Sequence, residues 1–202
     1  MYYKIVPDFN KVGAFPQASY TRYFEMSSEK FDREWKCPDF KLEKRARLTD
    51  FVFHNGSGCS TIISDGFFNT INDLMIADYQ KFDVRIIQNN KVFENYSYLH
   101  FIMHDGYFDF VDWPNSQFYK YLNHSEQQEK LTFNSYTELD SCFQSWLDTP
   151  YTVGGEVRLK EMDIDVMQFR LPFYPNGLIC SRKCKEALET TSFTGFLFEE
   201  LG

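Results

Sequence analysis

Two distant stretches of this chain carry the same succession of signals for a strand, a capped helix and a second strand. In the C-terminal stretch, the apolar run 178–180 leads into Ser181, whose hydroxyl can accept a hydrogen bond from a free amide of a first helical turn. Residues 196–198, which follow Gly195, alternate as strand residues do. Between them lies an apolar stripe at helical spacing, made of Cys184, Ala187 and Leu188.

The earlier stretch repeats this order around Ser64. The β-branched run 61–63 predicts a buried strand, and residues 82–87 predict the strand that follows the helix. Aligning the two serines also aligns Ile71 with Leu188. The sequence therefore predicts two copies of one strand–capped helix–strand unit. The apolar stripe of the earlier helix, which is expected to reach about Asp78, consists of Phe67, Ile71, Leu74 and Met75.

The remaining signals predict a single domain of the α+β class over residues 1–202, with a mixed or antiparallel sheet packed with a few helices. No linker or low-complexity segment divides the chain. Whether residues 1–49 form a separate arm stays open. Further strands are expected at 2–6, 82–88, 96–104, 156–160 and 166–171, a turn at Asn89–Asn90 and a helix at 138–146. A solvated helix or arm is expected at 27–50, most helical at 41–47, and a surface loop with a short helical turn at 112–127.

The C-terminal unit resembles the end of a bacterial family of polymorphic-toxin immunity proteins. Residues 179–188, which close on 194–198, carry this resemblance. Residues 62–64 with their helix, and 98–102 leading to 109–118, also fit it, so the likeness covers roughly residues 50–201. The resemblance implies a cytoplasmic protein that binds and neutralises a cognate toxin. It brings no catalytic residue with it.

Negative charge is concentrated in the middle of the chain. The formal net charge of the whole protein is −8, and residues 105–165 alone hold twelve Asp and Glu against four Lys and Arg. Such a field disfavours nucleic-acid binding and favours a basic partner, although acidity that serves only solubility explains it equally well. The oligomeric state stays open.

The acidic stretch supplies the predicted partner-binding residues. Trp113 beside Asp112 on a proline-bent loop suits an interface hot spot. The alternative is that Trp113 fills the core and Asp112 caps a turn at 115–116. Asp163 and Asp165 are expected to share an exposed strand face. The full predicted set is Asp109, Asp112, Trp113, Asp148, Asp163 and Asp165.

No set of residues makes a convincing catalytic or metal site, so we expect a protein that is not an enzyme and has no cofactor. His100 and His104 lie on a predicted strand, about 13 Å apart at a rise of about 3.3 Å per residue, too far to share one metal ion. Cys180 and Cys184 read as core residues. The alternative function is a small cytosolic hydrolase or transferase that uses Cys59 with His54, or one of the Asp pairs.

Two absences bear on localisation. The N-terminus shows no basic and apolar leader pattern, and no stretch approaches the roughly 18 apolar residues that a membrane span needs. The five cysteines are odd in number and scattered, unlike a disulfide framework. We therefore expect a cytoplasmic protein that contacts no membrane.

Overall fold

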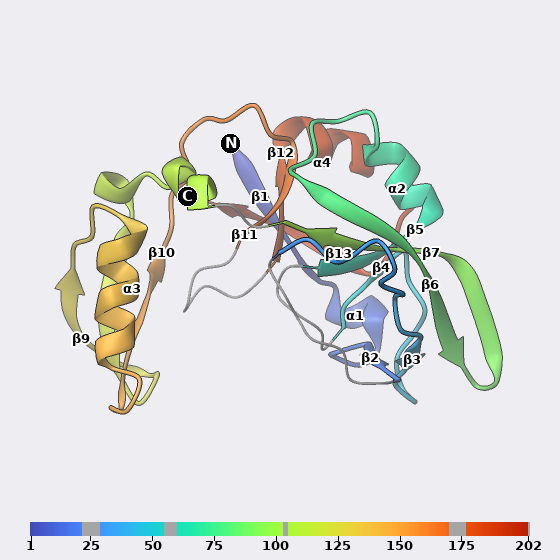
Figure 1. Cartoon of the computed structure of the whole chain (residues 1–202), viewed down its shortest axis with the longest axis horizontal. Helices are drawn as coiled ribbons and strands as arrows, with labels where there is room; N and C mark the ends of the chain where they lie inside the picture. Colours follow the sequence, from blue (N-terminus) through green and yellow to red (C-terminus); the bar gives the residue numbers. More distant parts are fainter. Residues whose placement is uncertain (22–28, 55–59, 103–104, 170–176, 202) are drawn as a thin grey trace.

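The computed structural model describes residues 1–21, 29–54, 60–102, 105–169 and 177–201. They form an α+β domain in which two larger sheets lie side by side and a smaller sheet with its own helix stands at one end of the long axis (Figure 1). The hairpin of strands β6 (Tyr79–Gln88) and β7 (Lys91–Phe101) projects at the opposite end. The predicted fold class is confirmed.

The largest sheet has the strand order β2-β3-β6-β7-β5-β4. Helix α2, Asp65–Ile71, follows β5 directly. A two-residue turn joins β6 to β7, and both of its residues, Asn89 and Asn90, have positive φ (48° and 64°), which is the type I′ hairpin geometry. The strands are β2 (Ala18–Tyr20), β3 (Phe40–Leu42), β4 (Phe51–Val52), β5 (Ser60–Ser64), β6 (Tyr79–Gln88) and β7 (Lys91–Phe101).

The second sheet brings the two ends of the chain together. Its order is β11-β12-β1-β13, and all of its pairings are antiparallel. Tyr2 pairs with Leu201, so the described termini lie next to each other. Its strands are β1 (Tyr2–Pro7), β11 (Val166–Phe169), β12 (Gly177–Ser181) and β13 (Phe196–Leu201), helix α4 (Arg182–Glu189) follows β12, and the short helix α1 (Phe9–Val12) follows β1.

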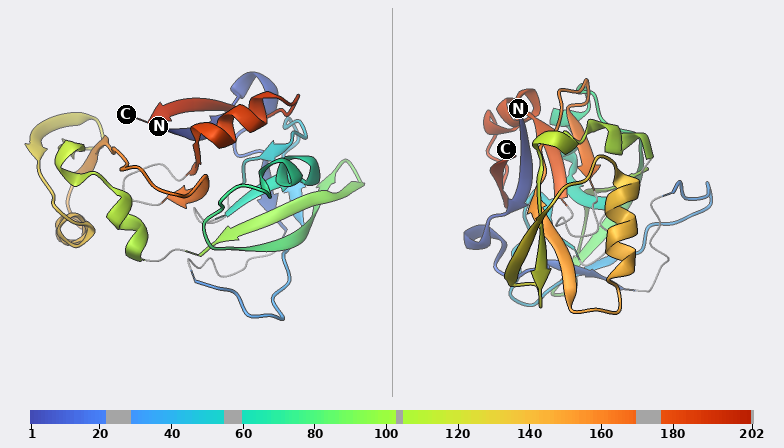
Figure 2. Two further views of the ribbon diagram at one scale, coloured as in Figure 1. Left: turned by 90° about the horizontal axis from the view of Figure 1, so that it is seen from above. Right: turned by 90° about the vertical axis from the view of Figure 1, so that its left-hand side faces the viewer.

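The two predicted units are present, and each extends to four strands. Strand β4 pairs with β5, β5 with β7 and β7 with β6; in the second unit β11 pairs with β12, β12 with β1 and β1 with β13. The registers also correspond, since Ser64 pairs with Tyr96 and Ser181 with Tyr2. The N-terminal strand β1 therefore takes in the second unit the place that β7 takes in the first. Helices α2 and α4 lie beside each other on the same side of the molecule (Figures 1 and 2).

An aspartate anchors each capping serine. Ser64 Oγ accepts a hydrogen bond from Phe67 N at 3.2 Å and donates to Asp50 Oδ1 at 2.9 Å. Ser181 Oγ accepts from Cys184 N at 3.2 Å and donates to Asp165 Oδ1 at 2.6 Å. The predicted N-caps are thus confirmed, each with an acidic partner on the strand side.

The same two aspartates connect the units to each other. The second carboxylate oxygen of Asp50 accepts from Thr194 N, in the loop after α4, at 2.9 Å. The second oxygen of Asp165 accepts from Met75 N, in the loop after α2, at 3.1 Å. Each unit therefore binds the loop that follows the other unit's helix, and the two exchange the same contact. We call the set Asp50, Ser64, Thr194 and Asp165, Ser181, Met75 the paired latches.

The small sheet is built from the acidic stretch, in the order β10-β8-β9. Leu139 of helix α3 is fully buried and belongs to the same core cluster as Phe118 and Val153 of this sheet. The same cluster includes Ile179 of the four-stranded sheet. A continuous core thus holds the small sheet to the rest. Its elements are β8 (Gln117–Leu122), β9 (Glu126–Leu131), β10 (Tyr151–Glu156), α3 (Tyr136–Ser145) and the 3₁₀ turns η1 (Asp105–Phe110) and η2 (Trp113–Asn115).

The six-stranded sheet is covered on both faces, which explains the unbroken apolar run in β5. Ile63 belongs to the main core, whereas its neighbour Ile62 belongs to a second cluster on the other face with Phe40 and Tyr98. Adjacent strand residues point to opposite faces, so a strand buried on both sides has no polar alternation.

Several sequence predictions about local structure are wrong. The strand expected at 156–160 is absent, because β10 ends at Glu156 and Leu159 makes only an isolated bridge with Val111. Residues 41–47 form no helix: Phe40 and Leu42 are buried on either side of exposed Lys41, a two-residue period that places β3 between β2 and β6. Residues 117–122 are strand β8 rather than loop, although the predicted helical turn is present as η2. Helix α2 ends at Ile71, and Met75 is 62% exposed because the chain turns there toward Asp165.

Candidate partner-binding site

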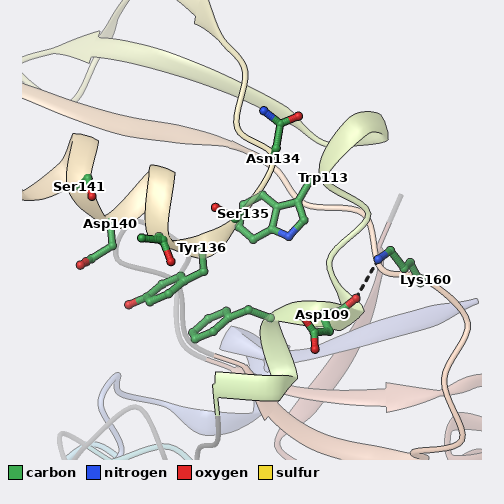
Figure 3. Close-up of a pocket in the computed structure, with 10 residues that line it drawn as sticks. Asp109, Trp113, Asn134, Ser135, Tyr136, Asp140, Ser141 and Lys160 are labelled. Atoms are coloured by element: carbon green, nitrogen blue, oxygen red, sulfur yellow. Dashed lines mark hydrogen bonds between the residues drawn. The ribbon is translucent and has the colours of Figure 1, made fainter.

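A pocket of about 510 Å³ lies between helix α3 and the turns η1 and η2 (Figure 3). Segments far apart in the sequence form its walls. Two of its residues, Asp109 and Trp113, belong to the predicted partner-binding set. The lining residues are Phe108, Asp109, Trp113, Asn134, Ser135, Tyr136, Thr137, Asp140, Ser141 and Lys160.

The first turn of α3 is held in place by its own capping residues. Ser135 Oγ accepts a hydrogen bond from Glu138 N at 3.3 Å, and the Glu138 carboxylate accepts from Asn134 N at 2.8 Å. This reciprocal arrangement resembles a capping box and stabilises the start of the helix. Tyr136 and Asp140 of this helix line the pocket (Figure 3).

An aromatic pair joins η1 to α3 at the pocket floor. The rings of Phe108 and Tyr136 are stacked with their centroids 3.7 Å apart and their planes 3° from parallel. Both side chains are partly buried against the main core. The pair therefore fixes the spacing of the two walls.

Trp113 is mainly a core side chain. It is 7% exposed, and its ring is stacked on Phe118 at 5.8 Å. Asp112 accepts from Asn115 Nδ2 at 2.8 Å through its carboxylate and from Ser116 Oγ at 2.8 Å through its carbonyl, so it organises the following turn. Trp113 therefore fills the core and Asp112 caps a turn, which was the alternative to an exposed interface hot spot. One edge of the indole still borders the pocket.

The charges around the pocket are unequal. Lys160 Nζ donates to the backbone carbonyl of Asp109 at 2.9 Å, which leaves the exposed Asp109 carboxylate without a hydrogen-bond donor among the residues that the structure describes. Asp140 accepts from Gln144 Nε2 at 3.3 Å. Two carboxylates and one ammonium give the lining side chains a net charge of −1.

The other predicted acids lie outside the pocket. Asp148 and Asp163 are exposed. The expectation that Asp163 and Asp165 share an exposed strand face is wrong, because β11 begins only at Val166 and the Asp165 side chain is 13% exposed. Asp165 belongs to the paired latches, and its hydrogen bonds explain its burial.

The pKa of Asp165 also differs from its ordinary value. Burial by itself raises the pKa of this carboxyl, but the hydrogen bonds from Ser181, Met75 and Lys183 outweigh burial and lower it. The charged form is therefore the one that the fold stabilises.

The alternative chemistry at His54 and Cys59 is only partly visible. Burial lowers the pKa of His54 to about 4, so the imidazole is neutral near pH 7. Cys59 lies outside the described residues, so a pairing between the two stays a prediction. His100 is fully buried, with Nε2 2.6 Å from the Glu29 carbonyl, and His104 also lies outside the described residues.

The cysteines near α4 are core residues. Cys180 and Cys184 are buried, and a hydrogen bond between the two thiols together with burial raises the pKa of Cys180, which keeps it protonated. Within the described ranges, no three His, Cys, Asp or Glu side chains converge as metal ligands would. None of the helices in the described part of the chain has the length and apolar character to cross a membrane.

A scan against protein-family models finds no match to this chain, and a search of curated proteins finds none either.

Sequence reasoning missed several pocket residues, notably Asp140 and Lys160. The spacing of Ser135 and Glu138 is a capping signal that could have located the start of α3 and so its first turn. No local signal places Lys160 beside Asp109, since their contact spans 51 residues of sequence.

Proposed function

We propose that this protein is a non-enzymatic binding protein that neutralises a cognate toxin in the cytoplasm by direct contact. The contact surface is the acidic, aromatic-containing end of the molecule formed by η1, η2, α3 and the small sheet. The supporting observation is the pocket there, because it combines an aromatic pair with two carboxylates inside the most acidic part of the chain. Interfaces use aromatic side chains as anchors and complementary charge for orientation.

The surroundings of the pocket support a basic partner. Residues on the same elements present exposed carboxylates to solvent, and only a few lysines and arginines interrupt them. Long-range attraction from such a surface accelerates encounter with a positively charged protein and weakens with salt. The exposed acids on these elements and in the loop after α3 are Asp109, Glu126, Glu129, Glu138, Asp148 and Glu156.

The test is co-expression with the product of a neighbouring toxin-like gene. We expect the protein to restore growth of cells that express the toxin and to elute with it as a complex. The double variant Asp109→Asn, Asp148→Asn should slow association, by about tenfold at low salt and by less at high salt. The matched control is Glu94→Gln, an exposed acid on the β6–β7 hairpin at the opposite end of the molecule. Absence of a complex with wild-type protein would refute the proposal.

A further inference from the structure

Resting on the proposed function, we propose that the pocket between α3 and η1 takes one arginine side chain of the toxin together with the backbone carbonyl beside it. The proposal names the chemical group that the site recognises. It depends on the shape, charge and unused hydrogen-bonding groups of the pocket.

The size of the pocket suits one side chain with its adjoining backbone. Its volume of about 510 Å³ falls within the range of roughly 300–1,000 Å³ for sites that hold small ligands. The stacked rings of Phe108 and Tyr136 line the pocket, as does the buried Trp113. Because packing fixes these walls, the cavity is present before a partner arrives.

The charges of the lining favour a single cation. Asp140 on α3 and Asp109 on η1 both line the pocket, and the Lys160 ammonium is held at the Asp109 carbonyl (Figure 3). One monovalent cation balances the resulting charge of −1. Guanidinium is planar and stacks on aromatic faces such as those that line this pocket, whereas ammonium is a compact point charge. Arginine therefore fits better than lysine.

Trp113 indicates that the arginine belongs to a peptide. Its indole N–H has no acceptor among the residues that the structure describes, although the side chain is 7% exposed, and the ring nitrogen is drawn facing the space above η1 (Figure 3). The indole nitrogen stays accessible from the pocket, so this N–H can donate to an acceptor on a bound molecule. Guanidinium has no acceptor to offer, so the bond must come from a carbonyl oxygen of the bound chain.

The indole N–H of Trp113 also provides the measurement. The protein has three tryptophans, so its amide correlation NMR spectrum contains few indole signals, and Trp113→Phe assigns the one required. The probe is N-acetyl-arginine methylamide. At the usual affinity per atom of a small ligand, we expect a Kd of about 1 mM.

Three matched compounds separate the contributions. The neutral isostere N-acetyl-citrulline methylamide should leave the Trp113 signal unmoved, because it lacks the charge. Butylguanidine, which keeps the single guanidinium charge but has no carbonyl, should bind at least about fivefold more weakly without moving the signal downfield. N-acetyl-lysine methylamide should bind about tenfold more weakly.

Variants test the carboxylates. Asp140→Asn and Asp109→Asn should each weaken binding of the arginine probe by about tenfold, whereas Asp148→Asn, outside the pocket, should not. The remaining amide signals report whether each variant stays folded. No saturable shift of Trp113 up to about 20 mM probe, twenty times the expected Kd, overturns the inference.

The outcome is separable from the proposed function. If the toxin complex forms but Asp140→Asn leaves its affinity unchanged, the pocket inference is wrong and the binding function stands. If no complex forms, the proposed function is wrong, and the titration with the arginine probe still decides whether the pocket recognises this group.

Discussion

Replacement of Asp165 by alanine should destabilise the whole domain, although the residue lies in an acidic stretch that has the composition of a solvent-exposed surface. Its carboxylate connects the cap of α4 to the loop after α2 through hydrogen bonds from Ser181 and Met75. Asp165→Ala removes both bonds, and Met75 N–H then has no carboxylate to donate to. The cap loses its support and the two units lose one of the paired latches.

The size of the effect follows from these contacts. A hydrogen bond to a charged group contributes about 1.5–3 kcal/mol net, and the Asp165 side chain is 13% exposed. The two bonds, at 2.6 and 3.1 Å, therefore contribute about 3 kcal/mol together if each counts at the lower end. The ion pair with Lys183 adds at most about 0.5 kcal/mol, because the lysine is 67% exposed.

The assay is urea unfolding followed by fluorescence, with the change in midpoint at constant slope as the readout. The matched control is Asp163→Ala, an exposed acid two residues away, which should change the free energy of unfolding by less than about 0.5 kcal/mol. Asp50→Ala, in the other latch, should lower the free energy of unfolding by a similar amount to Asp165→Ala. If the free energies of unfolding of Asp165→Ala and Asp163→Ala differ by less than about 1 kcal/mol, the reasoning is refuted.

Three further predictions follow from the same geometry. The difference in free energy of unfolding between wild type and Asp165→Ala should be constant above about pH 5 and should shrink as the pH falls below 3.8. The reason is that the fold lowers the pKa of Asp165, so only its charged form stabilises the native state. Urea unfolding at a series of pH values measures this difference. In a circular permutant, Asn-Gly would replace residues 202 and 1 and join Leu201 to Tyr2, and the new ends would lie in the β8–β9 turn. This join copies the two-residue turn between β6 and β7. The permutant should therefore keep the wild-type near-UV circular dichroism spectrum and unfold cooperatively. Gly195→Ala should cost at least about 2 kcal/mol, since φ is 104° and a Cβ would lie 2.5 Å from Thr49 Oγ1. Gly66→Ala in α2 should cost less, because its Cβ would lie 3.3 Å from the end of the Phe193 ring and away from backbone.

Local signals predicted the parts of the fold that depend on neighbouring residues. A serine cap bonds an amide three residues ahead, and a two-residue Asn turn needs no distant partner, so Ser64, Ser181 and Asn89–Asn90 were identifiable. Charge misled the prediction at residues 41–47, where burial of every second residue in a short strand outweighs helix-forming composition.

The candidate site was less predictable. Net charge pointed to the acidic stretch, and Asp109 does line the pocket. Composition could not separate Asp109, whose carboxylate is exposed, from Asp165, whose carboxylate is held by residues 16 and 90 positions away. The difference between a surface acid and a structural one is made entirely by those distant donors.

The sequence by itself determined the two capped units and the α+β class, because caps, turns and apolar periodicity act over a few residues. Only the tertiary structure decided that β1 completes the second unit, that the paired latches bind the units to each other, and that α3 and η1 enclose a pocket. These features rest on contacts between segments far apart in the chain. Their free energy exists only when the whole core has assembled, so no local pattern records it.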